Sequence, residues 1–91
     1  METYSIYIRN APWRATEDDL LAVMQAEGIG PVVGVRIIQD PETGRSRGYG
    51  FVDCADPKTR DKVCRMLDGL ELFGRRLAAE PAKPPRQQRG R

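Results

Sequence analysis

The segment from Arg47 to Cys54 constrains the fold most strongly, because its residues alternate in character at nearly every position. Successive side chains of a β-strand point to opposite faces. Alternation therefore gives two sets of side chains: Arg47, Tyr49, Phe51 and Asp53 on one face, and Gly50, Val52 and Cys54 on the other. The second set suits a packed core, so the two rings occupy the face where a half-buried strand normally carries polar residues. This inversion predicts a sheet with an open face that uses aromatic side chains.

The rest of the chain supplies three more strands and two helices. Residues 4–9 and 33–38 alternate in the same way, whereas Thr16 and the Asp56-Pro57 pair are typical helix starts. We expect the elements in this order: strand 4–9, helix 16–27, strand 33–38, strand 47–54, helix 57–68 and a last strand at 75–80. The β-α-β-β-α-β order predicts an α+β, ferredoxin-like sandwich, in which a four-stranded antiparallel sheet carries two helices on one face.

Two helices on one face leave the other face of the sheet uncovered. We expect the covered face to hold the apolar residues of both layers, namely Ile6, Ile8, Val35, Ile37, Val52, Leu77 and Ala79 with Leu20, Val23, Met24, Val63 and Leu67. The open face would carry Tyr7, Tyr49 and Phe51, and the chain has no spare helix to cover these rings. We expect Trp13, in the loop after the first strand, to pack beneath the sheet as an anchor.

Charge is distributed unevenly along the chain. The net charge is +2, yet residues 81–91 carry four basic side chains and no acid, which leaves 11 basic and 13 acidic groups in residues 1–80. We expect one folded domain over 1–82 and a flexible basic tail at 83–91, where Pro84 and Pro85 prevent regular structure. The overall charge of the domain does not favour nucleic acid, so a binding surface depends on where individual arginines lie.

The residues present disfavour several classes of protein. The chain has no histidine, and Cys54 and Cys64 do not form a Cys-x-x-Cys pair, so we expect no metal, no other cofactor and two reduced, buried thiols. No nucleophile lies beside a base, which disfavours an enzyme. The chain has no apolar run that would span a bilayer and no secretion signal. We therefore expect a soluble monomer without membrane contact, cytoplasmic, or nuclear if the source is a eukaryote.

Two segments resemble motifs of the RNA recognition motif family. Arg47 to Cys54 resembles its ribonucleoprotein octamer and departs from the pattern only at Cys54, where the family has an aromatic residue. Ile6 to Ala11 is similar to the family's hexamer, and the closing Gly74-Arg75-Arg76-Leu77 also fits. The resemblance covers residues 4–82 and points to short RNA-binding proteins with a single such domain, of the bacterial and glycine-rich type. It implies binding of single-stranded RNA.

The resemblance also implies a role for each matching residue. Tyr7 and Tyr49 would stack on bases, Phe51 would pack against sugar, and Arg47 would contact phosphate. Rings suit this task because unpaired bases expose π-faces, and each stacked base contributes ~1–3 kcal/mol. Asp53 would accept a hydrogen bond from a base edge. With the arginines placed on the open face by alternation, the expected RNA-binding residues are Tyr7, Arg9, Asn10, Arg36, Arg45, Arg47, Tyr49, Phe51, Asp53 and Arg76.

Two alternatives stay open at the level of sequence. Single-stranded DNA is a second candidate ligand, because the contacts to the 2′-hydroxyl that distinguish RNA cannot be located. A protein partner is a second candidate class, because exposed rings also suit protein docking. Ala78 and Glu80 stand on the last strand where family members commonly carry basic or polar residues. We therefore expect a platform for few nucleotides, used by a post-transcriptional regulator or an RNA chaperone.

Overall fold

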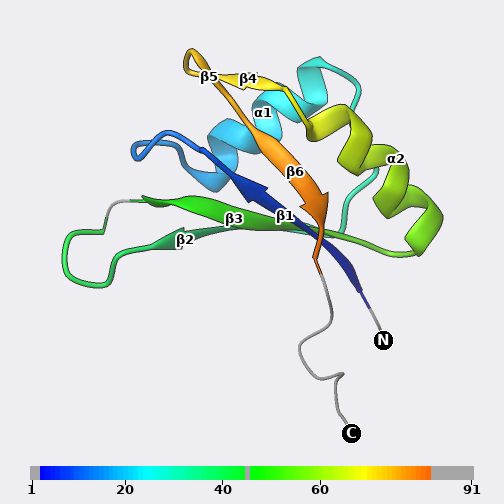
Figure 1. The fold of residues 1–91 in the computed structure, drawn as a ribbon, viewed down its shortest axis with the longest axis horizontal. Helices are drawn as coiled ribbons and strands as arrows, with labels where there is room; N and C mark the ends of the chain where they lie inside the picture. The colour runs from blue at the N-terminus through cyan, green and yellow to red at the C-terminus, as the bar shows by residue number, and fades with distance from the viewer. Residues whose placement is uncertain (1–2, 45, 83–91) are drawn as a thin grey trace, which may run out of the picture.

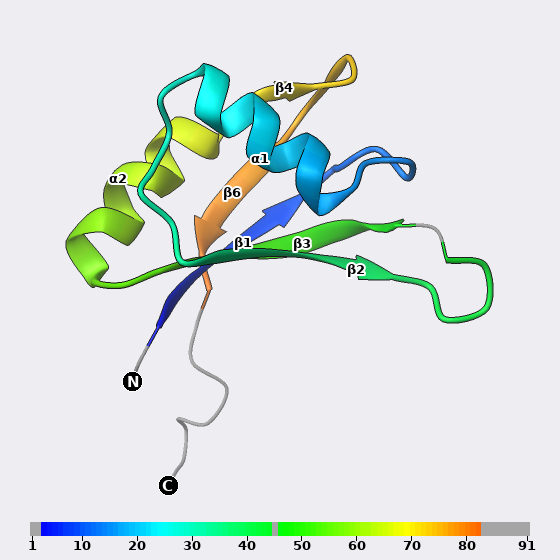
Figure 2. The same ribbon diagram turned by 180° about the vertical axis from the view of Figure 1, so that it is seen from behind.

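The computed structural model describes residues 3–44 and 46–82. The elements follow in the order β1 (Tyr4–Arg9), α1 (Glu17–Ala26), β2 (Gly34–Gln39), β3 (Ser46–Cys54), α2 (Pro57–Leu67), β4 (Glu71–Leu72), β5 (Arg75–Arg76) and β6 (Ala78–Pro81). Strands β2, β3, β1 and β6 form one sheet in that spatial order, with antiparallel neighbours. Both helices lie on the same side of it (Figure 1), and the view from behind shows the same layering (Figure 2). The predicted ferredoxin-like α+β fold is confirmed.

Side chains at the helix starts supply the partners that the first backbone N–H groups lack. The Thr16 hydroxyl accepts from the backbone of Asp19, and the Asp19 carboxylate accepts from the backbone of Thr16, so the predicted capping box is present. At α2, the Asp56 carboxylate accepts from the backbone N–H of Thr59 at 2.7 Å. This hydrogen bond is the main reason why the pKa of Asp56 lies below its ordinary value.

The core lies between the helices and the covered face of the sheet. Its fully buried side chains include Ile6, Ile8, Leu20, Met24, Val52, Cys54, Val63, Leu67, Leu72 and Leu77. Val23, Val35 and Ala79 are partly buried against this cluster, so the expected covered face is correct. Ile29, in the loop after α1, is 7% exposed and adds a side chain to the core beyond the helix end.

The expected continuous strand over 75–80 is wrong. Phe73 and Gly74 both have positive φ angles, 50° and 82°, and such a pair forms the tight turn of a two-residue hairpin. The turn draws β5 back onto β4, where Arg76 pairs with Glu71. Leu77 continues this pairing, since its N–H donates to Leu70 and its carbonyl accepts from Gly69. Only from Ala78 onward does the chain join β1.

Both cysteines are buried and free within the described residues. Burial raises the pKa of each thiol above its ordinary value of 9.0, as do the nearby charges of Asp53 at Cys54 and of Asp68 at Cys64. Across residues 3–44 and 46–82, no group of three or more candidate side chains could hold a metal ion. No helix in this part of the chain is long and apolar enough to cross a membrane.

Candidate nucleic-acid interface

A row of four side chains crosses the open face of the sheet. The strand register places Glu80 of β6 opposite Tyr7 of β1, Tyr7 opposite Phe51 of β3, and Phe51 opposite Arg36 of β2. Residues directly opposite in neighbouring antiparallel strands project on the same side of the sheet. The row therefore runs from an acidic residue through two aromatic rings to a basic residue, and each strand of the main sheet contributes one member.

The rings at the centre of the row touch each other and are partly exposed. The centroids of Tyr7 and Phe51 are 5.5 Å apart, and those of Tyr7 and Tyr49 are 5.8 Å apart, with tilted planes in both pairs. These separations fall within the range of favourable aromatic pairs. All three rings are half-buried, so their mutual contacts hold their orientation while part of each ring stays accessible. The predicted grouping of Tyr7, Tyr49 and Phe51 on the uncovered face is correct.

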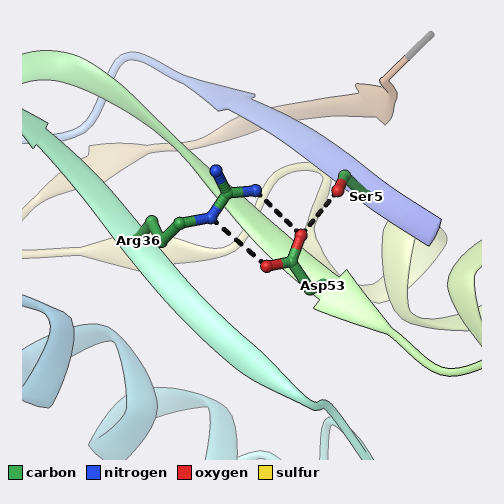
Figure 3. Close-up of polar contacts among 3 residues, drawn as sticks. All are labelled: Ser5, Arg36 and Asp53. Carbon is green, nitrogen blue, oxygen red and sulfur yellow. Dashed lines mark hydrogen bonds and ion pairs between the residues drawn. The ribbon is translucent and has the colours of Figure 1, made fainter. Parts of the chain in front are cut away.

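An ion pair fixes the basic end of the row. Nε and Nη2 of Arg36 donate to the two carboxylate oxygens of Asp53, at 3.2 and 2.9 Å. The Ser5 hydroxyl donates to the same carboxylate at 2.5 Å, so three neighbouring strands meet at Asp53 (Figure 3). The Arg36 guanidinium also lies 4.9 Å from the centroid of Phe51, a distance suited to a cation–π contact.

This arrangement changes what Asp53 and Arg36 can offer a ligand. The side chain of Asp53 is only 16% exposed, and its carboxylate already accepts hydrogen bonds on both oxygens. Its acceptors are therefore less available to a base edge than the sequence suggested. Arg36 is 55% exposed at its side chain, so it can still meet solvent or phosphate, although Asp53 neutralises much of its charge.

The other predicted residues fall into three groups. Arg9 lies opposite Tyr49 in the sheet, and its guanidinium is 5.9 Å from the Tyr7 ring, so it joins the open face. Asn10 turns to the hairpin instead, where its amide donates to the carbonyl of Arg76 at 2.8 Å. Arg76 belongs to β5 and not to the main sheet, so its expected placement by alternation is wrong. Arg45 lies outside the described residues, as does the side chain of Arg47.

Glu80 is the site residue whose role the sequence did not reveal. A hollow of about 390 Å³ opens beside the row and is lined by Tyr7, Phe51, Glu80, Pro81 and Ala82. No hydrogen bond or ion pair within residues 3–44 and 46–82 engages the Glu80 carboxylate. Alternation placed Glu80 on the open face, but its position against the Tyr7 ring requires the register between β6 and β1.

The expectation for Trp13 is wrong. Its side chain is 57% exposed, whereas Ala11, Pro12 and Ala15 of the same loop are buried. The loop is thus anchored by small residues on either side of Trp13. Asn10 fixes the start of this loop, since Nη2 of Arg75 donates to its side-chain oxygen at 2.9 Å.

Known proteins share this fold and these motifs. The family model of the RNA recognition motif matches residues 6–78. "Putative RNA-binding protein RbpE" of Nostoc sp. is 40% identical over 86 residues, which cover 94% of this chain and 84% of that protein. "Cleavage stimulation factor subunit 2" of Homo sapiens is 38% identical over 78 residues, which cover 86% of this chain but 13% of that protein.

A solved structure with bound nucleic acid is similar as well. "Structure of Rna15 RRM with bound RNA (GU)" superposes with a TM-score of 0.72 at 30% identity, and the match covers 88% of this chain and 83% of that one. An α+β fold whose sheet carries aromatic rings and arginines on its uncovered face is typical of domains that bind single-stranded nucleic acid. The extent of the family match makes the assignment specific: the chain belongs to the RNA recognition motif family.

Proposed function

We propose that the chain binds a few nucleotides of single-stranded RNA on the open face of its sheet. The observation that carries the proposal is the contact between the Tyr7 and Phe51 rings, 5.5 Å apart at the centre of a face that neither helix covers. Tyr7 and Tyr49 stack on bases, and Phe51 packs against sugar between them. Each stack contributes ~1–3 kcal/mol and tolerates any base, so the platform gives affinity with little sequence preference.

The arginines of the open face differ in their contribution. Arg9 neutralises phosphate beside the Tyr7 and Tyr49 stacks. Arg36 serves first to support Phe51, because Asp53 holds its guanidinium against that ring. The acceptors of Asp53 are already occupied. Glu80, which lines the hollow beside Tyr7, is therefore the residue that accepts hydrogen bonds from a base edge.

The chemistry of the hollow selects for a base edge that donates hydrogen bonds. Pro81 has no backbone N–H, and the N–H of Ala82 already donates to the Ser5 carbonyl at 2.9 Å. Apart from the Tyr7 hydroxyl, the lining therefore offers acceptors, of which the Glu80 carboxylate is the strongest. Guanine presents two adjacent donors on its Watson–Crick edge, whereas uracil presents one donor between two acceptors. The hollow thus favours guanine.

The small size of the platform supports a proposal for the biological setting. A monomer that holds few nucleotides suits a post-transcriptional regulator or an RNA chaperone in the cytoplasm, or in the nucleus if the source is a eukaryote. Single-stranded DNA is the competing ligand, because ring stacking does not require a 2′-hydroxyl. A module for protein recognition is the second candidate function, and the exposed rings are the feature that favours it.

The experiment that tests the proposal removes both central rings. The Tyr7→Ala/Phe51→Ala double variant should lose measurable binding to a short single-stranded RNA while its circular dichroism spectrum stays unchanged, since neither ring belongs to the core. Val33→Ala is the matched control, because Val33 is 61% exposed and precedes β2. Retention of wild-type affinity by the double variant would refute the proposal. A partner protein that shifts the ring signals when RNA does not would instead support protein recognition.

A further inference from the structure

Two further exposed aromatic residues lie off the platform, one in the loop after β1 and one in the β4–β5 hairpin. Trp13 is 57% exposed and Phe73 is 48% exposed, and both belong to short connections at the same end of the molecule in both views (Figure 1 and Figure 2). The guanidinium of Arg14 lies 5.1 Å from the Phe73 ring centroid and joins the two connections. We call the residues of this region the edge patch: Arg9, Trp13, Arg14, Phe73 and Arg75.

Hydrogen bonds hold the two halves of the edge patch in a fixed relation. The Asn10 side chain donates to the Arg76 carbonyl at 2.8 Å and accepts from the Arg75 guanidinium at 2.9 Å. The start of the loop is therefore held against β5 of the hairpin, so the two segments are not independent loops. Preorganisation of this kind reduces the entropy lost when a ligand binds across both segments.

The residue at the hairpin tip has an unfavourable backbone conformation. Phe73 has a φ of 50°, a conformation that glycine and asparagine tolerate and that bulky side chains rarely adopt. Phe73 is 48% exposed and does not belong to the core cluster. Phe73 does not stabilise the turn, and strained residues cluster at binding sites. Its position is therefore best explained by contact with a ligand.

The charge of the edge patch indicates an anionic ligand. Residues 9–15 and 71–76 together carry four arginines and one acid, Glu71, although residues 1–80 as a whole have more acidic than basic groups. Arginines interleaved with exposed rings are suited to single-stranded nucleic acid, where the charges meet phosphate and the rings meet bases. The patch is also continuous with the platform, since Arg9 lies 5.9 Å from the Tyr7 ring and Asn10 follows it.

We infer that the edge patch is a second RNA-binding site, which takes nucleotides of the same strand after they leave the sheet. Trp13 and Phe73 stack on bases there, and Arg14 and Arg75 contact phosphate. The inference rests on the proposed function, because the platform holds the strand whose continuation the edge patch binds. It predicts a footprint longer than the few nucleotides that the sheet alone accommodates.

The test compares a short and a long oligonucleotide, (GU)2 and (GU)6, by fluorescence anisotropy. In the Trp13→Ser/Phe73→Asn variant, affinity for (GU)6 should fall about thirtyfold or more, the effect of losing two base stacks of ~1–3 kcal/mol each. Affinity for (GU)2 should stay unchanged. Asparagine suits the positive φ of the turn, and an unchanged circular dichroism spectrum should confirm that the variant keeps the wild-type fold. Met66→Gln, at an exposed position of α2, is the control and should change neither affinity.

The single tryptophan of the chain supplies an independent readout. In the wild type, (GU)6 should quench the fluorescence of Trp13, and (GU)2 should bind without quenching it. The inference is overturned if the double variant loses affinity equally for both oligonucleotides, if it loses affinity for neither, or if bound (GU)6 leaves the fluorescence unchanged. A wild type that binds neither oligonucleotide would refute the proposed function itself, and this inference with it.

Discussion

Replacing Gly50 with alanine should destabilise the fold from the centre of the sheet. Gly50 lies in β3 between Ile8 of β1 and Ile37 of β2. A Cβ atom at this position would stand 2.3 Å from the carbonyl oxygen of Arg36 and 3.1 Å from the Cα of Ile37. Both atoms belong to the backbone, so no change of rotamer relieves the contact. Strand β2 would have to move away by ~1 Å to restore ordinary van der Waals separation.

The cost of this movement follows from the behaviour of overpacked cores. Such substitutions typically cost ~1–3 kcal/mol, and a clash with backbone belongs at the upper end. Alanine also has less conformational freedom than glycine in the unfolded chain, and this difference stabilises the folded state by ~0.4–1 kcal/mol. The net destabilisation is therefore about 2 kcal/mol, which lowers the midpoint of thermal unfolding by about 8–16 °C in a domain of this size.

Gly34→Ala is the matched control for this prediction. Gly34 lies in β2 of the same sheet, has no positive φ, and a Cβ built there meets nothing within 4 Å. The control should raise stability slightly, by ~0.4–1 kcal/mol. Thermal and urea unfolding followed by circular dichroism would measure both variants. Equal stability of Gly50→Ala and Gly34→Ala would refute the reasoning, because it would mean that the close approach of β2 to β3 is not required.

Three further predictions concern the charged and titratable groups. Asp53→Asn removes the ion-pair partner of Arg36, so that Arg36 can contact phosphate and RNA should bind more tightly at low salt. The slope of log affinity against log salt concentration should steepen by about 0.7. An unchanged slope would show that Arg36 does not contact phosphate. Glu80→Gln should reduce the preference for (GU)3 over U6 by ~1 kcal/mol or more, measured by competition; a preserved preference would assign base selection elsewhere. The pKa values of the Cys54 and Cys64 thiols are raised above 9.0 in the fold, so the thiols of the unfolded chain ionise first and stability should fall as the pH rises past 9. The midpoint of urea unfolding should therefore be lower at pH 9.5 than at pH 8 in the wild type. The two midpoints should agree once both cysteines are replaced by alanine.

The strands and the orientation of their side chains were predictable because alternation has a period of two. The regular runs around Ile6, Ile37 and Phe51 needed only this rule to separate the core from the open face. The helix starts were equally readable, since Thr16 and Asp56 satisfy backbone N–H groups through local hydrogen bonds. In both cases the information lies within a few residues of the element itself.

The hairpin after α2 was not predictable by the same means. Phe73 is an unusual residue for a turn that requires positive φ, so the sequence carried no local signal for the tight β4–β5 connection beyond Gly74. The pairing of Arg36 with Asp53 and the approach of Glu80 to Tyr7 depend on strand register. Register is a property of the assembled sheet, and a shift by one residue would reverse every facing pair.

The exposure of Trp13 shows a further limit of sequence reasoning. A lone tryptophan in a loop is more often an anchor, and burial of its large apolar area would normally stabilise the loop. Here the small residues Ala11 and Ala15 are buried instead, and the indole stays outside. Which side chain of a loop is buried depends on the path of the backbone, and composition alone does not determine that path.

The most direct test of the account is an NMR titration of the wild-type chain with (GU)2. The account predicts shifts of the Tyr7, Tyr49 and Phe51 ring protons, with intermolecular contacts between base protons and the two tyrosine rings and between sugar protons and Phe51. Met66, on the exterior of α2, should stay unmoved as an internal reference. Saturable binding of the RNA that leaves all three ring signals unchanged would contradict the central claim that the open face of the sheet binds RNA.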